Sequence, residues 1–457
     1  MNDNGYAKLG LARSHGRALH TRLHGLGSSF LLQFAIGAWC CMTGGQTHAA
    51  DLAGDCCADL EERVAELEAT TARKGNRKVK LVVSGYVAQE VTWWDDGGES
   101  NVYLHGLGPT QATHIKFNGE AQIAPGLTAG YLMRIQNLED NPFGRSGADA
   151  MDQNSASFSQ GLKVQMSYWY LQSKDLGTVS VGKQAPAAKS AAMFTDKSGT
   201  QIIDNYTFLD GFPQFIIRSG GDLAPAALTW GQLAFCYSQN VPLGGDCDGL
   251  VMNAVRYDTP VIAGFSASAS WGEDDDWQIA ARYAGEVSGF KVLLGFGYSG
   301  STDEKLAVPV ASMLKKDSRY AQAGGYVEHV ATGIFVHGAY GHEDNSGTVL
   351  AGGLAPRGGD HWYLKAGIRK KWTPFGATVV YGDYGQYIDQ IGPGALALGV
   401  TSSELDQAGG GIVQEIDAAS MSVWIKYRAQ SADISGAGPI GSLDDLHTIS
   451  TGALINF

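Results

Sequence analysis

The chain ends in Thr448-Ile449-Ser450-Thr451-Gly452-Ala453-Leu454-Ile455-Asn456-Phe457, an alternating stretch whose last residue is aromatic. One face collects Ile449, Ala453, Ile455 and Phe457, and the other collects Thr448, Ser450, Gly452 and Asn456. The ends of soluble proteins usually fray into water. A final strand with apolar side chains toward lipid and an aromatic residue at the interface is instead typical of outer-membrane β-barrels. The last ten residues therefore predict a membrane-spanning barrel strand.

The same two-residue alternation recurs along most of the chain after residue 78. It is clearest in three successive segments, Val261–Trp271, Trp277–Tyr283 and Phe290–Tyr298. A further segment places one face on Leu162, Val164, Met166, Tyr168 and Tyr170. Many of these segments approach the roughly 9–11 residues that a tilted strand needs to cross a bilayer. The pattern predicts strands with one face toward lipid and the other toward a lumen.

The connections between these segments alternate between tight turns, as at Thr259-Pro260, and long stretches, as at residues 137–160. Short periplasmic turns and long outer loops are typical of outer-membrane barrels. We therefore predict an all-β fold, a transmembrane antiparallel β-barrel of 16–18 strands. The segments around residues 179–184, 212–219 and 405–413 have weak patterns, and they leave the two counts open.

Tryptophans gather near the ends of the expected strands, at Trp93, Trp94, Trp271, Trp277, Trp362 and Trp424. Such residues are expected in aromatic belts at the two membrane interfaces. A water-soluble β-sandwich would show the same alternation, but it would rarely combine so many strands with aromatic residues at their ends. This combination favours the barrel.

The first 78 residues read differently from the rest. Residues 1–50 have a basic start, an apolar core at Phe30–Trp39 and a small-residue end, which together predict a signal peptide. Residues 51–78 contain an expected periplasmic helix, Asp59–Ala69, with Leu60, Val64 and Leu67 at heptad spacing. Two heptads are too short to pair alone, so a trimeric coiled coil and a solvated tether both remain open. The barrel domain is expected at residues 79–457.

The chain is acidic, with a formal net charge of -13, which argues against nucleic acid as a partner. The acidity is explained equally well by solubility and by a vestibule that attracts cations.

Six cysteines fit an oxidising compartment, and we expect a disulfide between Cys236 and Cys247 across a short loop. No histidine accompanies them, so neither a metal site nor a cofactor is expected. The sequence assigns no partners to Cys56 and Cys57.

Two stretches carry a resemblance to a known family. One is Cys57–Glu68 running into Arg77-Lys78-Val79, and the other is Arg256-Tyr257-Asp258-Thr259-Pro260 through Ala269–Asp275. In these places the chain resembles the alphaproteobacterial (rhizobial-type) general porins. The resemblance implies a homotrimer of barrels in the outer membrane that passes small hydrophilic solutes passively. It also implies a third outer loop that folds inward and narrows each pore.

A barrel of 16 or more strands leaves an aqueous channel, and the charges at its narrowest part decide its selectivity. The best candidate for the narrowing loop is Ala185–Gly211 with Asp196, Asp204 and Asp210. Alternation places basic residues on the inner wall at Arg134, Lys163, Arg218, Arg256, Arg282, Lys365, Arg369 and Lys426. Loop carboxylates opposite a basic wall would set a transverse field across the pore. For any one residue, a merely solvated charge is an equal alternative.

Three other functions compete with a general porin. An enzyme is disfavoured because the sequence has neither a Gly-x-Ser-x-Gly elbow nor a Gly-x-x-x-x-Gly-Lys-Ser/Thr loop. A plugged structural or adhesive barrel usually carries a separate soluble domain. A substrate-specific channel would need an aromatic path inside the lumen, and the inward faces read as more charged than aromatic. We expect an unspecific porin for passive diffusion of ions and small hydrophilic solutes.

Overall fold

A computed structural model describes residues 79–108, 111–138, 161–205, 212–273, 275–303, 313–438 and 440–457. All of these residues belong to one compact unit, which spans residues 68–457. The expected signal peptide, the heptad helix, Cys56, Cys57 and Asp210 lie outside the described residues. Their assignments stay predictions.

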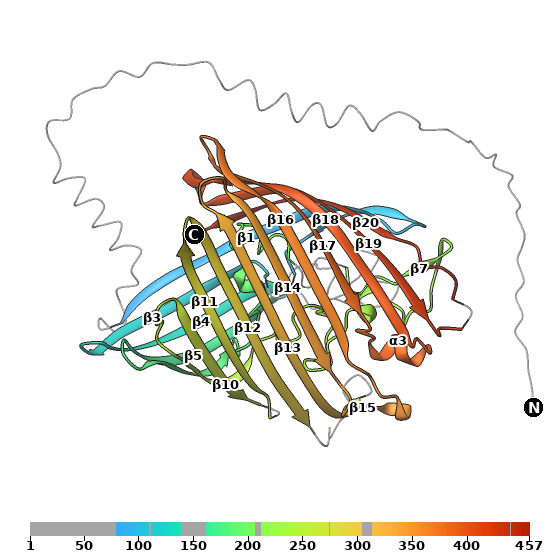
Figure 1. Cartoon of the computed structure of the whole chain (residues 1–457), viewed down its shortest axis with the longest axis horizontal. Helices are drawn as coiled ribbons and strands as arrows, with labels where there is room; N and C mark the ends of the chain where they lie inside the picture. Colours follow the sequence, from blue (N-terminus) through green and yellow to red (C-terminus); the bar gives the residue numbers. More distant parts are fainter. Residues whose placement is uncertain are drawn as a thin grey trace, which may run out of the picture. The chain divides into compact units, whose positions relative to one another are not determined.

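In the part of the chain that the structure describes, eighteen strands form one sheet, and Figure 1 shows its course. They are β1 (Lys80–Asp95), β2 (Ser100–His105), β3 (His114–Ala124), β4 (Leu127–Leu138), β5 (Gly161–Ser173), β6 (Gly177–Gln184), β9 (Met252–Asp258), β10 (Phe265–Gly272), β11 (Trp277–Val287), β12 (Phe290–Asp303), β13 (Met313–His329), β14 (Ile334–Asp344), β15 (Val349–Leu350), β16 (Gly359–Thr373), β17 (Gly376–Ile388), β18 (Ser402–Ile416), β19 (Met421–Ser435) and β20 (Leu446–Asn456).

The sheet closes into a barrel because β1 pairs with β20. Every pairing is antiparallel, and the strands make sixteen wall positions. Strands β2 and β3 share one position because both pair with β1 on the same side. Strand β15 continues β14, since both pair with β13. The expected antiparallel barrel is confirmed, at the lower of the two predicted counts.

Helical structure is sparse in the described residues. It comprises the α-helix α3 (Pro393–Ala397) and the 3₁₀ turns η3 (Met193–Thr195), η4 (Trp230–Leu233), η5 (Ala351–Gly353) and η6 (Asp417–Ala419). Within the described ranges, no helix has the length and apolar character that crossing a membrane requires.

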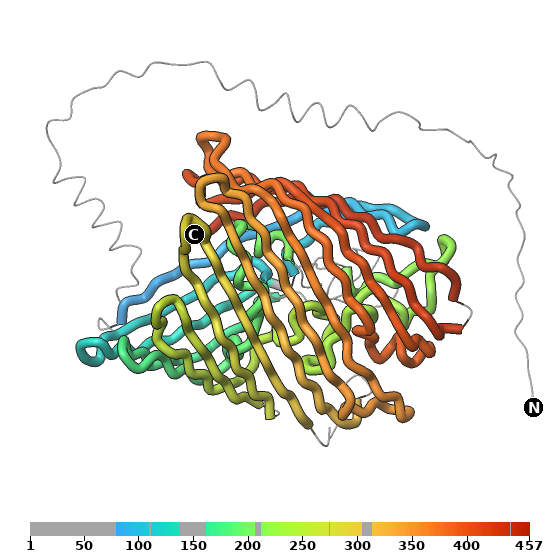
Figure 2. The backbone as a smooth tube through the Cα atoms, in the orientation of Figure 1, coloured from blue at the N-terminus to red at the C-terminus, as the bar shows by residue number. Residues whose placement is uncertain are grey.

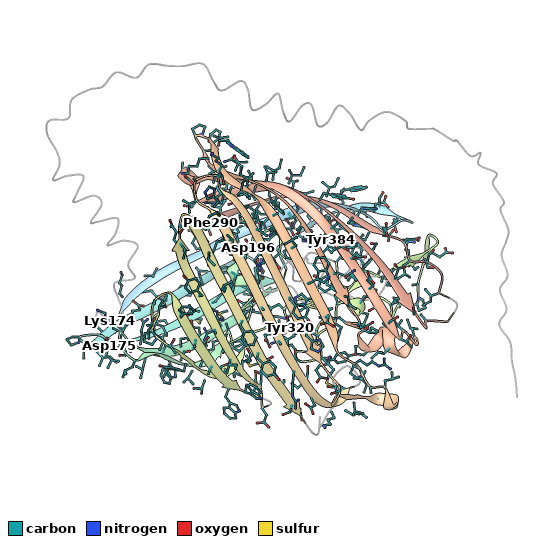
Figure 3. All side chains as sticks on the ribbon, viewed as in Figure 1. Lys174, Asp175, Asp196, Phe290, Tyr320 and Tyr384 are labelled. Atoms are coloured by element: carbon teal, nitrogen blue, oxygen red, sulfur yellow. A yellow bond between two sulfur atoms is a disulfide. The ribbon has the colours of Figure 1, made fainter. Side chains whose placement is uncertain are left out.

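The outer surface of the wall is apolar, with aromatic side chains near both strand ends. Phe290 and Tyr384 are examples, and both are exposed on the outside (Figure 3). Trp271, Trp277 and Trp362 are also exposed, as the sequence predicts. The prediction is wrong for two tryptophans of the same set, which are buried on the inner side: Trp94 and Trp424. Residue alternation, rather than residue type, decides which face each one occupies.

A β-bulge corrects the predicted faces of β5. Its register against β4 shifts between Arg134 and Ile135, which inserts one extra residue in β5. A bulge leaves one residue unpaired, so the side chains on its two sides fall on opposite faces. Leu162 and Val164 are exposed on the outside, whereas Tyr168 and Tyr170 line an inner cavity. The inner wall is therefore more aromatic than the sequence indicated.

The connection between β6 and β9 is the longest in the described barrel and runs from residue 185 to residue 251. It contains η3, η4 and the short hairpin of β7 (Arg218–Ser219) and β8 (Asp222–Leu223). Figure 2 shows this green stretch behind the yellow and orange strands. We call residues 185–205 the inner segment and residues 212–251 the cap.

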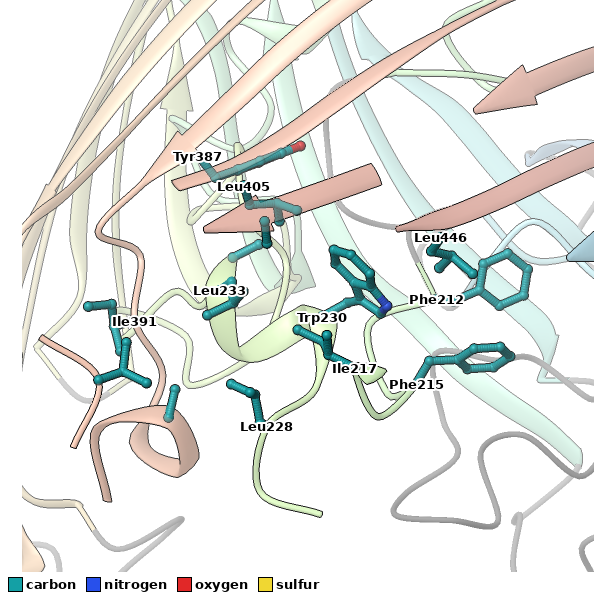
Figure 4. Close-up of a cluster of buried hydrophobic side chains, with 14 of the residues drawn as sticks. Phe212, Phe215, Ile217, Leu228, Trp230, Leu233, Tyr387, Ile391, Leu405 and Leu446 are labelled. Atoms are coloured by element: carbon teal, nitrogen blue, oxygen red, sulfur yellow. The ribbon is translucent and has the colours of Figure 1, made fainter. Parts of the chain in front are cut away.

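The cap packs through a buried apolar cluster (Figure 4). Phe212, Phe215 and Trp230 of the cap pack in it with Leu405 and Leu446 of the wall. Residues 212–219, one of the three weakly patterned segments, thus belong to the cap and not to the wall. The other two lie in β6 and β18. Alternating apolar and polar residues can thus occur in a loop that packs one side against the wall, as well as in a strand of the sheet.

A disulfide joins Cys236 to Cys247 within the cap, with a Cα–Cα distance of 5.2 Å. Both cysteines are buried, and they contact Leu243 and Tyr320. The predicted disulfide is confirmed. Closing a loop of this length removes conformational freedom from the unfolded chain, so the bond stabilises the folded cap.

Candidate functional site: the channel interior

The inner segment is fastened to the wall by its own backbone. Three of its backbone amides donate hydrogen bonds to side chains of three different wall strands. The Ala187 amide donates to Ser270 Oγ of β10 at 2.9 Å, and the Ala188 amide donates to Gln278 Oε1 of β11 at 3.0 Å. The Ala192 amide donates to Gln322 Oε1 of β13 at 3.0 Å. Buried amides need such partners because an unpaired one is costly. The Ala-rich sequence supplies small side chains, which lets the backbone lie close to the wall.

Wall glycines make room for this close approach. A Cβ atom on Gly295 of β12 would lie 2.1 Å from the carbonyl oxygen of Ala191. One on Gly324 of β13 would lie 2.6 Å from the carbonyl oxygen of Ala192. Any larger residue at these two positions would push the inner segment toward the pore axis. The glycines are thus part of what sets the width of the channel.

Asp196 fastens the middle of the inner segment to β16. Its Oδ2 atom lies 3.0 Å from Lys365 Nζ, and the lysine also donates to Thr200 and to the carbonyl oxygen of Asp204. Burial opposes ionisation of this carboxyl group, but Lys365, His337 and Ser198 outweigh it and lower the pKa of Asp196. Asp196 is therefore a buried anion that is compensated by the wall.

Asp204 fastens the end of the segment in the same way. Its carboxylate pairs with Arg428 of β19 and accepts a 2.7 Å hydrogen bond from the Tyr381 hydroxyl. Burial again opposes ionisation, and Arg428, Lys426 and Lys365 again lower the pKa of Asp204. The sequence predicts that Asp196 and Asp204 face a basic wall across an open pore. The structure instead buries both directly against that wall.

Two predicted wall arginines hold the start of the inner segment. Arg256 of β9 pairs with Asp258 and donates to the carbonyl oxygens of Ala185 and Pro186. Arg282 of β11 donates to the carbonyl oxygen of Ala187 at 2.7 Å. The sequence correctly indicated that these side chains point inward, but it carried no signal for the carbonyls that they bind.

The remaining predicted basic residues occupy different surroundings. Arg369 pairs with Glu415 of β18 at 2.6 Å. Arg218 lies in β7 of the cap, where it pairs with Asp96, and so it is not the wall residue that the sequence predicted. Lys163 is exposed on β5 and does not line the main cavity. Arg134 of β4 does line that cavity.

The main cavity has a volume of about 460 Å³ and lies between the inner segment and the opposite wall. The segment contributes Lys189, Met193, Phe194 and Ile202, and strands β3 to β5 contribute His114, Lys116, Arg134, Gln165 and Met166. Sequence reasoning missed the role of Phe194 and Ile202, because alternation in a loop says nothing about which side faces the lumen.

A second cavity of about 390 Å³ neighbours the first and shares Met166 and Ala185 with it. Tyr168 and Tyr170 line it, and the Tyr170 hydroxyl donates to Glu120 at 2.9 Å. It lies toward the tight turn between β5 and β6, where Lys174 and Asp175 are found at the left of Figure 3. The two cavities therefore follow one side of the lumen, from the middle toward the end with the short turns.

Comparison with known proteins identifies a family and a shared fold. A profile of the Gram-negative porins matches residues 49–437. An anion-selective porin from Comamonas acidovorans is similar in structure, with a TM-score of 0.52 and 15% identity over 83% of this chain and 100% of that one. OmpF of Salmonella typhi, in complex with daunomycin, gives a TM-score of 0.47 and 16% identity over 83% and 98%.

No curated protein matches the chain. The structural likeness is at low sequence identity and shows the shared barrel fold. The family match spans most of the chain, including the inner segment and the cap. It places the barrel in the outer membrane as a channel for the diffusion of small solutes, and the chain belongs to the Gram-negative porin family.

Proposed function

We propose that this porin is a general, non-enzymatic diffusion channel of the alphaproteobacterial type that acts as a homotrimer, each barrel with its own pore. One observation carries the proposal. The inner segment contacts the inner face of the wall from β10 to β19. The two cavities on the opposite side of the lumen remain as the route for solutes. A lumen narrowed along one side passes small hydrophilic solutes and excludes large ones.

The trimer rests on sequence features rather than on described contacts. Residues 59–69 carry heptad spacing, and three copies held by neighbouring barrels would concentrate these short helices enough to pair. The alphaproteobacterial assignment rests on the stretches Cys57–Glu68 and Arg256–Asp275. The non-enzymatic assignment rests on the absence of hydrolase and phosphate-loop motifs from the sequence.

The order of segments in the chain is part of the same proposal. Residues 1–50 act as a signal peptide that is removed on export, and residues 51–78 form the helix and linker on the periplasmic side. Residues 79–457 form the barrel. Mass spectrometry of the protein extracted from outer membranes would locate the first residue of the mature chain.

Reconstitution into planar bilayers tests the channel directly. The mature protein should insert in events of three equal conductance steps, and vesicles that carry it should admit small sugars but exclude large oligosaccharides. A matched vesicle preparation without protein is the control. Single, unrepeated steps would contradict the trimer, and electrically silent bilayers would contradict the diffusion channel.

A further inference from the structure

The two sides of the main cavity differ in chemistry. Between residues 193 and 204 the exposed positions of the inner segment are Phe194, Lys197, Gly199 and Ile202. None of these is acidic, and Phe194 and Ile202 are 45% and 37% exposed within the lumen. The cause is the fastening described above: Asp196 and Asp204 point to the wall, so Phe194 and Ile202, each two residues before one of these aspartates, turn toward the channel.

The facing wall is basic. Lys116 of β3 and Arg134 of β4 are directly opposite one another in the sheet, and both line the cavity. Like charges at paired positions of neighbouring strands destabilise a sheet, so this pair favours a site where an anion compensates both. The His114 side chain contacts the Arg134 guanidinium: His114 Nδ1 lies 3.1 Å from Arg134 Nη2.

The segment adds a third cation to the lining. Lys189 borders the cavity and donates to the carbonyl oxygen of Gly249. The acidic side chain of the lining is Asp246, which is buried and accepts hydrogen bonds from the Ser190 backbone and hydroxyl; the last residue, Phe457, also borders the cavity. Three basic side chains thus face one acidic side chain in this lining, although the chain as a whole carries a net charge of -13.

We propose that the constriction preferentially binds and passes small amphipathic organic anions, carboxylates with an aromatic or aliphatic body. The carboxylate lies between Lys116 and Arg134, and the apolar body lies over Phe194 and Ile202. A volume of about 460 Å³ accommodates such a molecule, and sites for small ligands typically have this size. The proposal rests on the diffusion function, because it concerns which solutes use that passage.

Benzoate and acetate are suitable probes, because they share a carboxylate and differ in the apolar body. Chloride current through the reconstituted trimer is measured while either anion is added. Benzoate should reduce the current saturably at concentrations where acetate has little effect, because bound benzoate occupies the passage. In a potassium chloride gradient, the reversal potential should show a preference for chloride over potassium.

Two double variants test the basic part and the apolar part of the site separately. Lys116→Gln with Arg134→Gln should abolish both the benzoate block and the chloride preference. Phe194→Ser with Ile202→Ser should weaken the benzoate block at least about fivefold, since small apolar contacts discriminate by such factors, and should leave the chloride preference in place. Lys163→Gln is the matched control, because this exposed lysine of β5 does not line the cavity. Heat-dependent migration in detergent gels verifies that each barrel is folded.

Three results would overturn the proposal without touching the diffusion function. The wild-type channel could prefer potassium, benzoate and acetate could block equally, or the serine variant could behave like the wild type. A wild-type protein that carries no current would instead contradict the diffusion channel itself, so the two failures are distinguishable.

Discussion

Asp196 and Lys365 form an ion pair of 3.0 Å that is sealed from water, with 1% and 0% of the two side chains exposed. One partner lies on a loop and the other on the barrel wall. A buried charge without its partner is strongly destabilising, so this pair holds the inner segment in one place. The width of the channel therefore depends on an interaction that is itself outside the water path.

Removing the lysine should release the inner segment. Lys365→Met leaves the Asp196 carboxylate buried without its cation, at a cost of about 3–5 kcal/mol. We expect a barrel that still folds but shows noisy current with frequent closures in planar bilayers. The matched control is Lys371→Met, which breaks an exposed pair with Asp417 that should contribute little. Equally quiet recordings from both variants would contradict the fastening role.

Acid should loosen the same contacts. The pKa values of Asp196 and Asp204 are both lowered in the folded protein. Their contribution to stability is therefore present above the ordinary aspartate pKa of about 3.9 and is lost as the pH falls below it. Closures should become more frequent below about pH 4, as single-channel recording at stepwise lower pH would show. A variant that combines Asp196→Asn with Asp204→Asn should already show frequent closures at pH 7, and its closure frequency should change less as the pH falls. A closure frequency that rises with acid as in the wild type would show that other groups are responsible.

The position of the inner segment should also depend on the absence of a side chain at the wall glycines. Gly295→Ala places a Cβ atom against the carbonyl oxygen of Ala191, and overpacking of this kind costs about 1–3 kcal/mol. The variant should have altered conductance, because the inner segment must shift. Gly325→Ala on β13 is the control, since its nearest contact would be the side chain of Leu294 at 3.4 Å. The same conductance in both variants would show that the segment adapts without moving.

The disulfide should stabilise the cap independently of the barrel. Replacing Cys236 and Cys247 by serine opens a loop with a sequence separation of 11 and should cost about 3 kcal/mol. We expect faster proteolysis within residues 212–251 while the barrel keeps its heat-dependent migration in gels. A reductant should reproduce the effect in the wild type and have none in the variant. Equal proteolysis with and without the bond would contradict this role.

Much of the fold could be predicted from the sequence because alternation is local. Residues such as Ile449 and Ile455 fall on the lipid side by their parity alone. The same rule failed at β5, where the bulge opposite Arg134 and Ile135 moves Tyr168 and Tyr170 to the inner face. A bulge leaves no reliable mark in the residue pattern, because it is fixed by the register of the neighbouring strand.

The sequence by itself determined the closed antiparallel barrel and the short loop closed by Cys236 and Cys247, since both depend on neighbours in the chain. Only the tertiary structure decided what faces the water path. Asp196 reaches Lys365 across 169 residues, and Asp204 reaches Arg428 across 224. Because such partners come together only when the barrel closes, a loop that reads as acidic presents Phe194 and Ile202 to the channel instead.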